Sequence, residues 1–126
     1  IEQELTKAAG DQITISFVPH LMPVTAGIHT TIFAKLKSDF SAVEEALEAA
    51  YADTPFVRLR GPGGSPDTKH VTGTNFLDIG WHHDPRTNRV IITSAEDNLG
   101  KGAAGQAVQS FNLIVGNLET DGLQKL

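Results

Sequence analysis

Residues 100–105 have the pattern that most directly suggests chemistry. They match G-x-G-x-x-G, follow an expected strand, open an expected helix, and have acidic residues about 20 positions further on. In a dinucleotide-binding fold the acidic residue must close a second parallel strand, and the first glycine lies at the strand end. Here the stretch after Gly116 is short and polar, and residues 94–98 separate the strand from the first glycine. A self-contained nucleotide site is therefore not expected.

The same segment keeps two physical interpretations. A glycine-rich start of a helix presents free N–H groups and a positive dipole end, and Lys101 adds charge, which would suit a phosphate or a nicotinamide. Alternatively, Gly102, Ala103 and Ala104 are small because this end of the helix packs closely against another surface. Both interpretations stay open from the sequence.

The other candidate groups do not assemble into a site. The sequence has five histidines, but His82 and His83 are adjacent on an expected strand, so they point to opposite faces and cannot easily share one ion. No metal site is expected. Cysteine is absent, and Ser65 follows two glycines in a loop instead of standing at a strand-turn-helix elbow. We therefore expect no complete active site in this chain.

Size and charge indicate one soluble domain. The chain has 126 residues, 40% of them hydrophobic, which is enough for one modest core. Its net charge is −5 and its ten basic residues are scattered, so we expect no nucleic-acid partner. No apolar run approaches the roughly 20 residues of a membrane span, and no secretion signal is visible. We expect a cytoplasmic protein that does not bind membranes, and a chain that begins at Ile1 as part of a longer one.

Hydrophobic periodicity predicts the elements that position these residues. Gly10 and Gly116 suit the C-terminal ends of helices, and Ser41 with Glu44 forms an S-x-x-E capping box at the start of the clearest helix. Between Gly10 and Pro19, polar and apolar residues alternate as in a half-buried strand. The predicted helices are 1–9, 41–52 and 103–115, and the predicted strands are 12–18, 28–36, 56–59, 75–82 and 89–95.

The order of these elements favours an α+β fold. The strands at 75–82 and 89–95 should pair antiparallel across a turn at 83–88, whose Pro and Asn suit a hairpin. Residues 28–59 form a β-α-β stretch. We expect a single domain with a mainly antiparallel or mixed sheet and helices packed on one face.

Three runs of sequence, in order along the chain, resemble one family. They are residues 19–23 (PHLMP), 68–80 (TKHVTGTNFLDIG) and 97–109 (DNLGKGAAGQAVQ), and the similarity continues through 119–123. Together they are similar to the N-acetyl-γ-glutamyl-phosphate reductases, and residues 97–103 are more distantly similar to aspartate-semialdehyde dehydrogenases. The resemblance implies the fold of a glyceraldehyde-3-phosphate dehydrogenase-like C-terminal domain.

The resemblance implies that residues 1–126 are the substrate-binding and dimerisation domain of a two-domain, NADP-dependent reductase with a Rossmann domain upstream. In such enzymes of arginine biosynthesis a cysteine thiolate attacks an acyl phosphate, and NADPH reduces the thioester to N-acetylglutamate semialdehyde while a histidine handles protons. Both catalytic residues would lie upstream of Ile1, so the isolated chain would be inactive. A homodimer or homotetramer formed through the sheet is also implied.

Only secondary roles transfer to residues of this chain. By resemblance, Asn98, Lys101 and Gly102 approach the nicotinamide end of NADP, and the final helix packs across the domain boundary. A stand-alone, non-catalytic α+β domain that binds a small molecule or a partner is the alternative from another class. The acidic charge and the lack of catalytic groups fit that alternative equally well.

On the substrate side the resemblance implies His20 and Lys69, although a structural role for His20 is an equal alternative. One departure concerns the substrate. Ala26 precedes Gly27 where the family commonly has Arg, a residue that would suit an anionic group. Recognition of that group would then fall to Lys69 or to residues outside this chain, or the substrate would differ, as in an aminoadipyl analogue.

Overall fold

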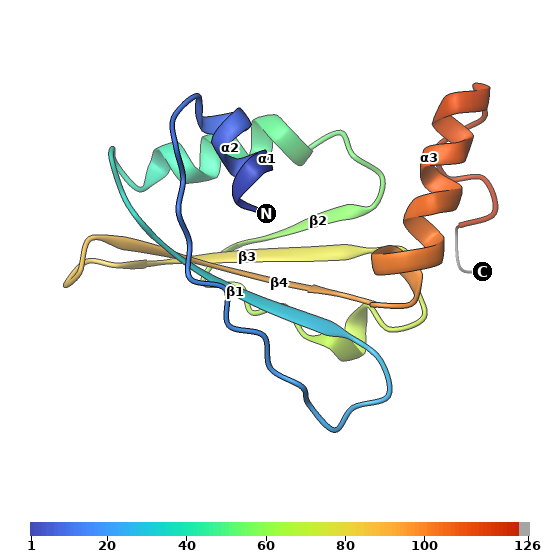
Figure 1. The fold of residues 1–126 in the computed structure, drawn as a ribbon, viewed down its shortest axis with the longest axis horizontal. Coiled ribbons are helices and arrows are strands. Elements are labelled where there is room, and N and C mark those ends of the chain that lie inside the picture. Colours follow the sequence, from blue (N-terminus) through green and yellow to red (C-terminus); the bar gives the residue numbers. More distant parts are fainter. Residues whose placement is uncertain (124–126) are drawn as a thin grey trace.

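The computed structural model describes residues 1–123 and contains three α-helices and a four-stranded sheet (Figure 1). The elements follow in the order α1 (Glu2–Ala9), β1 (Ile28–Lys35), α2 (Ser41–Tyr51), β2 (Val57–Pro62), β3 (Leu77–Asp84), β4 (Arg89–Glu96) and α3 (Gly105–Val115). A 3-10 turn, η1 (Thr68–His70), precedes β3, and a π-helical turn, η2 (Gly100–Ala104), leads into α3. The α+β class predicted from the sequence is confirmed.

The sheet is mixed and has the strand order β1-β4-β3-β2. β4 pairs antiparallel with both β1 and β3, whereas β2 runs parallel to β3. The predicted β3–β4 hairpin is confirmed, and Asn88 in its turn takes a φ of 50°, which asparagine tolerates better than most residues. Register places Ile32, Ile92 and Trp81 in one row across three strands.

Helix α2 packs on the face of the sheet to which this row belongs and forms the core with it. The buried centre of the core is Ile79, Trp81 and Val90. Three side chains at helical spacing on α2 pack against that centre: Val43, Leu47 and Tyr51. Complete burial of a large apolar side chain contributes roughly 1.5–3 kcal/mol. These contacts fix β3 and β4, the two strands whose ends carry the candidate site.

The start of α2 differs from the prediction. The expected capping box is not formed, because Phe40 is the N-cap, with φ −60° and ψ −32°, and no side chain of residues 1–123 caps the helix. Since Phe40 is itself helical, Ser41 lies one position too far inside the helix to cap it. The ring of Phe40 stacks on that of His83 with the centroids 5.0 Å apart, so packing on β3 holds this end of the helix.

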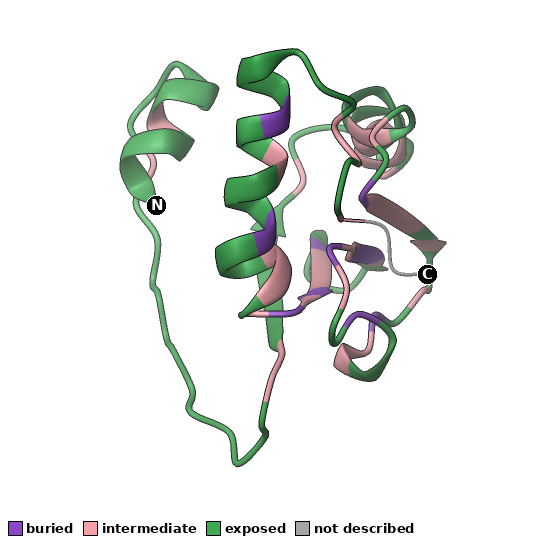
Figure 2. Ribbon diagram, turned by 90° about the vertical axis from the view of Figure 1, so that its right-hand side faces the viewer, coloured by how far each residue is buried: buried purple, intermediate pink, exposed green. Residues whose placement is uncertain are grey.

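The strand predicted at 12–18 is wrong. This segment, called the arm below, has no ladder partner among the residues that the structure describes and is exposed along most of its length (Figure 2). Two side chains of α1 hold it: the Thr6 hydroxyl accepts the N–H of Ile13 at 3.0 Å, and the Glu2 carboxylate accepts that of Ile15 at 2.8 Å. Alternation marks a segment suited to a sheet, but a strand forms only where another strand supplies its hydrogen bonds.

The helix ends agree with the prediction more closely than the helix starts. Gly10 and Gly116 both take left-handed conformations at the ends of α1 and α3. The last helix begins at Gly105 instead of residue 103, because the preceding residues form the π-helical turn. Within residues 1–123 we find no helix with the length and hydropathy needed to span a membrane.

Candidate functional site

Asp97, directly after β4, ties two loops together. Its buried carboxylate accepts the N–H groups of Leu99 at 2.7 Å, Gly100 at 2.9 Å and Gly73 at 2.5 Å. The bond from Gly73 contributes most to lowering the pKa of Asp97, with those from Gly100 and Leu99 acting in the same direction and burial opposing them. The start of η2 is thereby fixed to the turn before β3.

Asn98 attaches a third segment. Its side-chain Oδ1 accepts the N–H of Gly27 at 2.7 Å, which fixes the end of loop 19–27 beside the end of β4. Gly27 has a φ of 120°, and a Cβ atom there would lie 2.8 Å from Cβ of Thr68. Segments 19–27, 68–74 and 97–102 therefore meet at Asp97 and Asn98, and we call this place the three-loop junction.

The glycine pattern of η2 is explained by close packing. Atoms of Asp97 accept three N–H groups of this turn, since Gly102 donates to its backbone carbonyl at 2.8 Å in addition to the two bonds to its carboxylate. A Cβ atom on Gly100 would lie 2.7 Å from the carbonyl oxygen of Thr74, and one on Gly105 would overlap the side chain of Asn75. These N–H groups are not free for an anion, although Ala103 and Ala104 are exposed.

The ammonium group of Lys101 points into the structure. Nζ donates to Oε1 of Gln109 at 2.6 Å, and Gln109 in turn donates to the Glu119 carboxylate at 2.6 Å and accepts from Asn75 at 3.0 Å. Burial lowers the pKa of Lys101, against the opposing charges of Glu96 and Glu119. Burial also raises the pKa of Glu96, while Lys101 lowers it. Lys101 therefore joins η2 to α3.

The two residues predicted on the substrate side do not meet in this structure. His20 is exposed, and its Nδ1 lies 3.1 Å from the carbonyl oxygen of Val18. Lys69 is exposed in η1 and forms an ion pair with Asp67 at 2.9 Å. Lys69 follows Thr68, whose side chain packs against Gly27, so η1 and loop 19–27 are neighbours at the three-loop junction. Asn98 lies at this junction, and Gly102 is exposed beside it.

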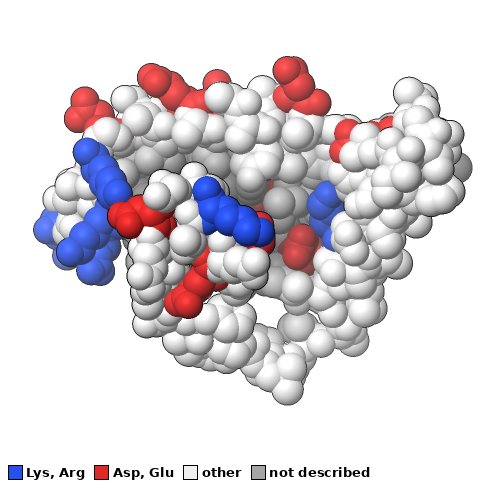
Figure 3. Space-filling model, turned by 45° about the horizontal axis from the view of Figure 1, so that its top comes forward, with Lys and Arg blue, Asp and Glu red and all other residues white. Residues whose placement is uncertain are grey.

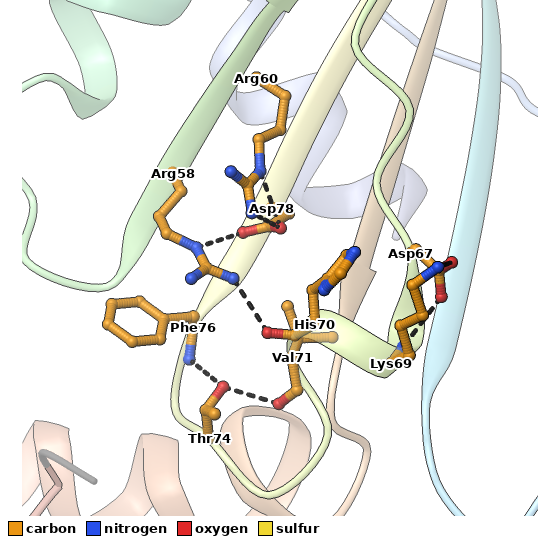
Figure 4. Close-up of polar contacts among 9 residues, drawn as sticks. All are labelled: Arg58, Arg60, Asp67, Lys69, His70, Val71, Thr74, Phe76 and Asp78. Atoms are coloured by element: carbon orange, nitrogen blue, oxygen red, sulfur yellow. Dashed lines mark hydrogen bonds and ion pairs between the residues drawn. The ribbon is translucent and has the colours of Figure 1, made fainter. Parts of the chain in front are cut away.

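A cluster that the sequence analysis did not single out lies on the sheet face opposite α2 (Figure 4). The fully buried carboxylate of Asp78 accepts from Arg58 at 2.5 Å and from Arg60 at 2.6 and 2.9 Å. Arg58 also donates to the carbonyl oxygen of His70 at 3.1 Å and lies 4.4 Å above the Phe76 ring. The arginines and Ser65 line a hollow of about 470 Å³. The alternation of two arginines on one strand could have indicated this cluster from the sequence. That Asp78 is their partner follows only from the parallel register of β2 and β3.

Charge and metal-ligand geometry add no further site. On the face that Figure 3 shows, acidic side chains line the upper edge and several basic side chains gather at the left, while near the middle the two kinds lie next to each other. Within the described part of the chain, no three His, Asp or Glu side chains come close enough together to hold a metal ion.

Comparison with known proteins places this fold in a family. The family described as semialdehyde dehydrogenase, dimerisation domain, matches residues 1–98. The chain belongs to that dimerisation-domain family. The dimerisation domain is 60% identical over 125 residues to the N-acetyl-γ-glutamyl-phosphate reductase of Akkermansia muciniphila, covering 98% of this chain and 36% of the relative. It is 52% identical to the reductase of the same name from Geobacter metallireducens, covering 100% of this chain and 37% of the relative.

The chain thus spans little more than a third of the length of these curated relatives. The resemblance to the N-acetyl-γ-glutamyl-phosphate reductases predicted from three runs of sequence is confirmed. A crystal structure of aspartate semialdehyde dehydrogenase II from Vibrio cholerae, complexed with ASA, matches with a TM-score of 0.58. At 23% identity, over 75% of this chain and 28% of that one, it supports the fold of the dimerisation domain.

Proposed function

We propose that this chain is the substrate-binding and dimerisation domain of an NADP-dependent N-acetyl-γ-glutamyl-phosphate reductase, a cytoplasmic enzyme of arginine biosynthesis. The observation that carries the proposal is the 60% identity to a reductase of that name across 98% of the chain. The relative is far longer than the matched part, since the match covers 36% of it, which leaves room for a Rossmann domain. The catalytic cysteine and histidine would belong to the part of the enzyme upstream of Ile1.

The residues of this chain could contact one part of a bound NADP molecule, but they could not bind the whole dinucleotide. The N–H groups of Leu99, Gly100 and Gly102 are bonded to Asp97 and are not available to a pyrophosphate. Gly102 is exposed close to Asn98 and has no side chain to obstruct a flat ring. Bound NADPH would supply the hydride, and Asn98 and Gly102 would border its nicotinamide end. Lys101, bonded to Gln109, would hold η2 in position.

The outer surface of α3 supports a domain boundary at this helix. Phe111 is 58% exposed and Ile114 82%, and Leu118, just beyond the end of α3, is 73% exposed, although all three are large and apolar. A group of large apolar side chains exposed along one helix marks a surface that contacts a partner. We assign this surface to the contact with the nucleotide-binding domain, which would bring η2 to the cofactor.

Substrate recognition would use loop 19–27 and η1. Asn98 fixes the end of the loop through Gly27, and His20 lies further along the same loop. Ala26 offers no charge where the family commonly has Arg, so an anionic group of the substrate would depend on Lys69 or on residues of the upstream domain. Lys69 is exposed, and its ion pair with Asp67 is a surface pair that costs little to rearrange. Association into a homodimer or homotetramer would occur through the sheet.

The proposal is tested on the reductase that contains this chain, by the oxidation of N-acetylglutamate semialdehyde with inorganic phosphate and NADP. We expect NADPH to form, and to form much more slowly from aspartate semialdehyde. Asn98→Ala should raise the KM for NADP about tenfold, the effect of roughly 1.4 kcal/mol. Asn117→Ala, at an exposed position just beyond α3, is the matched control and should leave the KM unchanged.

Two outcomes would contradict the proposal. If the full reductase formed no NADPH from N-acetylglutamate semialdehyde, the substrate assignment would be wrong. The isolated chain should give no heat on calorimetric titration with NADPH and no thermal shift. Tight binding there would mean that residues 100–105 form a complete nucleotide site, and the two-domain proposal would have to be abandoned.

A further inference from the structure

Gln109 joins four segments of the chain through one amide group. Its Oε1 accepts from Nζ of Lys101, in η2, at 2.6 Å and from the amide of Asn75, just before β3, at 3.0 Å. Its Nε2 donates to the carboxylate of Glu119, beyond α3, at 2.6 Å. An ammonium group only donates and a carboxylate only accepts, so these two partners require this one orientation of the amide. Glu119 therefore determines which atom of Gln109 faces Lys101.

The backbone of Glu119 is held against α3. Gly116 ends the helix with a left-handed φ of 78°, and the chain then runs back along the helix (Figure 1). The buried side chain of Asn112 donates to the backbone carbonyl of Glu119 at 3.3 Å and to that of Asp121 at 2.9 Å. The carboxylate of Glu119 is therefore presented to Gln109 by a turn that is hydrogen-bonded to the helix.

Lys101 is attracted by two carboxylates within residues 1–123, those of Glu96 and Glu119. Its ammonium group is linked to Glu119, because Gln109 bonds to both. Glu96 instead lies beside Gly102, since a Cβ atom built on that glycine would be 3.6 Å from its Oε1. If Gln109 released the ammonium group, the attraction of Glu96 would therefore draw it toward the exposed surface of Gly102.

Resting on the proposed NADP site, we propose that Glu119 is a positioning residue for the nicotinamide end of the cofactor. It acts through Gln109, which holds the ammonium group of Lys101 away from Gly102. The surface formed by Gly102 and Asn98 then stays clear for a flat ring. The nicotinamide ring is cationic in oxidised NADP and neutral in NADPH, so an ammonium group beside it would repel only the oxidised form.

The first test compares the two forms of the cofactor on the complete reductase that contains this chain. Calorimetric titration should show that Glu119→Ala raises the Kd for NADP about tenfold and that for NADPH less than about threefold. A general loosening of the fold would weaken the binding of both forms equally. Asp121→Ala is the matched control and should change neither Kd, because it removes an exposed carboxylate from the same turn and keeps the backbone bond from Asn112.

The second test exchanges the amide and the carboxylate. Gln109→Glu alone places a carboxylate opposite that of Glu119, so the Kd for NADP should rise as it does in Glu119→Ala. The double variant Gln109→Glu, Glu119→Gln restores a donor at position 119, and the carboxylate at position 109 still accepts from Lys101 and Asn75. In this variant the Kd for NADP should return to within about twofold of the original value.

The third test follows the direction of Lys101 without any cofactor. The complete reductase is treated with an amine-acetylating reagent, and the rate of modification of each lysine is read by mass spectrometry. Glu119→Ala should increase the rate at Lys101 severalfold, because the ammonium group leaves Gln109. The rate at Lys37, which is exposed at the other end of β1 from Gly27, should not change.

The results separate this proposal from the proposed function. Equal weakening of NADP and NADPH binding by Glu119→Ala, without recovery in the double variant, would give Glu119 a structural role only and would overturn the proposal. An unchanged rate of modification at Lys101 would overturn it as well. If the unsubstituted protein showed the expected differences between variants but formed no NADPH from N-acetylglutamate semialdehyde, the positioning role would hold and the substrate assignment would be wrong.

Discussion

At the scale of single residues, Asp97 and Asn98 are neighbours with separate structural tasks. The carboxylate of Asp97 satisfies N–H groups from the turn before β3 and from η2, whereas the amide of Asn98 holds the N–H of Gly27. The bonds at Asp97 need a carboxylate, which has two acceptor oxygens, whereas the one bond at Asn98 needs a single acceptor oxygen. The candidate site therefore depends on Asp97 even though Asp97 is too deeply buried to contact a ligand.

Asp97→Asn should make the fold less stable and less sensitive to acid. The pKa of Asp97 is lowered in the folded chain, first by the N–H of Gly73. The resulting stabilisation is present above the unfolded value of about 3.9 and is lost as the pH falls through the folded pKa. The amide of the Asn variant would turn its NH2 group toward one buried backbone N–H, which then has no acceptor. We therefore expect the free energy of unfolding to fall by about 1–3 kcal/mol at pH 7.

Urea unfolding at pH 7 and pH 3 measures this effect. The difference in unfolding free energy between Asp97→Asn and the unsubstituted chain should become smaller at pH 3. Protonation of Asp97 there removes part of the stabilisation that its carboxylate provides. Asp53→Asn removes a charge from an exposed position and should change the unfolding free energy by less than about 0.5 kcal/mol. A constant difference between the two pH values would contradict the assigned cause.

Gly27→Ala should destabilise the three-loop junction. Gly27 has a φ of 120°, and an added Cβ atom would lie 2.8 Å from Cβ of Thr68. Gly61→Ala is the control, because its φ of 76° lies near the left-handed region that alanine tolerates better than a φ of 120°, and no described atom lies within 4 Å of the added atom. We expect Gly27→Ala to cost about 2 kcal/mol more than Gly61→Ala in urea unfolding. Equal costs would contradict both the backbone strain and the close contact with Thr68 assigned to Gly27.

The sequence predicted which residues belong to the candidate site better than it predicted where their side chains point. Asn98 and Lys101 stand out in a glycine-rich segment that follows a strand. The inward direction of Lys101 was not predictable, because it depends on Gln109 and on Glu119 beyond α3, which the chain brings together only on folding. The ion cluster around Asp78 was missed for the same reason, since its arginines lie on a different strand.

At the scale of elements, α3 is held by its polar residues. Asn112 is buried and donates to the carbonyl oxygens of Asp121 at 2.9 Å and Glu119 at 3.3 Å, which folds the segment after α3 back along the helix. Phe111 beside it is 58% exposed. The usual order, in which apolar residues anchor a helix and polar ones face water, is reversed here.

Replacing the polar residue Asn112 should therefore lower the unfolding free energy more than replacing its apolar neighbour Phe111. In the isolated chain, Asn112→Ala should cost about 1–2 kcal/mol because it leaves two carbonyl groups without their donor. Phe111→Ser should change the unfolding free energy by less than about 0.5 kcal/mol. Urea unfolding of both variants is the measurement. A larger loss for Phe111→Ser would mean that α3 packs on this chain through its apolar stripe.

The predicted elements that formed are those whose partners lie nearby in the chain. The β3–β4 hairpin needs only its own turn, and α2 needs only the sheet face that its neighbours in sequence supply. Residues 12–18 have an equally clear alternating pattern, but no strand within residues 1–123 pairs with them. Local pattern therefore predicts the capacity to form a strand, and the partner decides whether the strand exists.

At the scale of the whole molecule, the residues of the buried core lie in sequence between two regions that expose large apolar side chains. The exposed large apolar side chains fall before residue 34 or after residue 98. The first group contains the arm and β1, and the second contains Leu99 and the outer side of α3. Groups of exposed apolar side chains of this kind are covered when a domain contacts another domain or another subunit.

This division predicts an unusual pair of optical signals for the isolated chain. The sequence has one tryptophan, Trp81, and it is 1% exposed in the core. Its emission should be shifted to the blue and resist quenching by acrylamide, while the chain binds an apolar dye such as ANS strongly at its two ends. A molten globule would also bind the dye, but its tryptophan would be quenched readily. In the full-length protein, dye binding should fall severalfold while the Trp81 emission stays the same, because the proposed nucleotide-binding domain and partner subunit would cover these surfaces and leave the core unchanged.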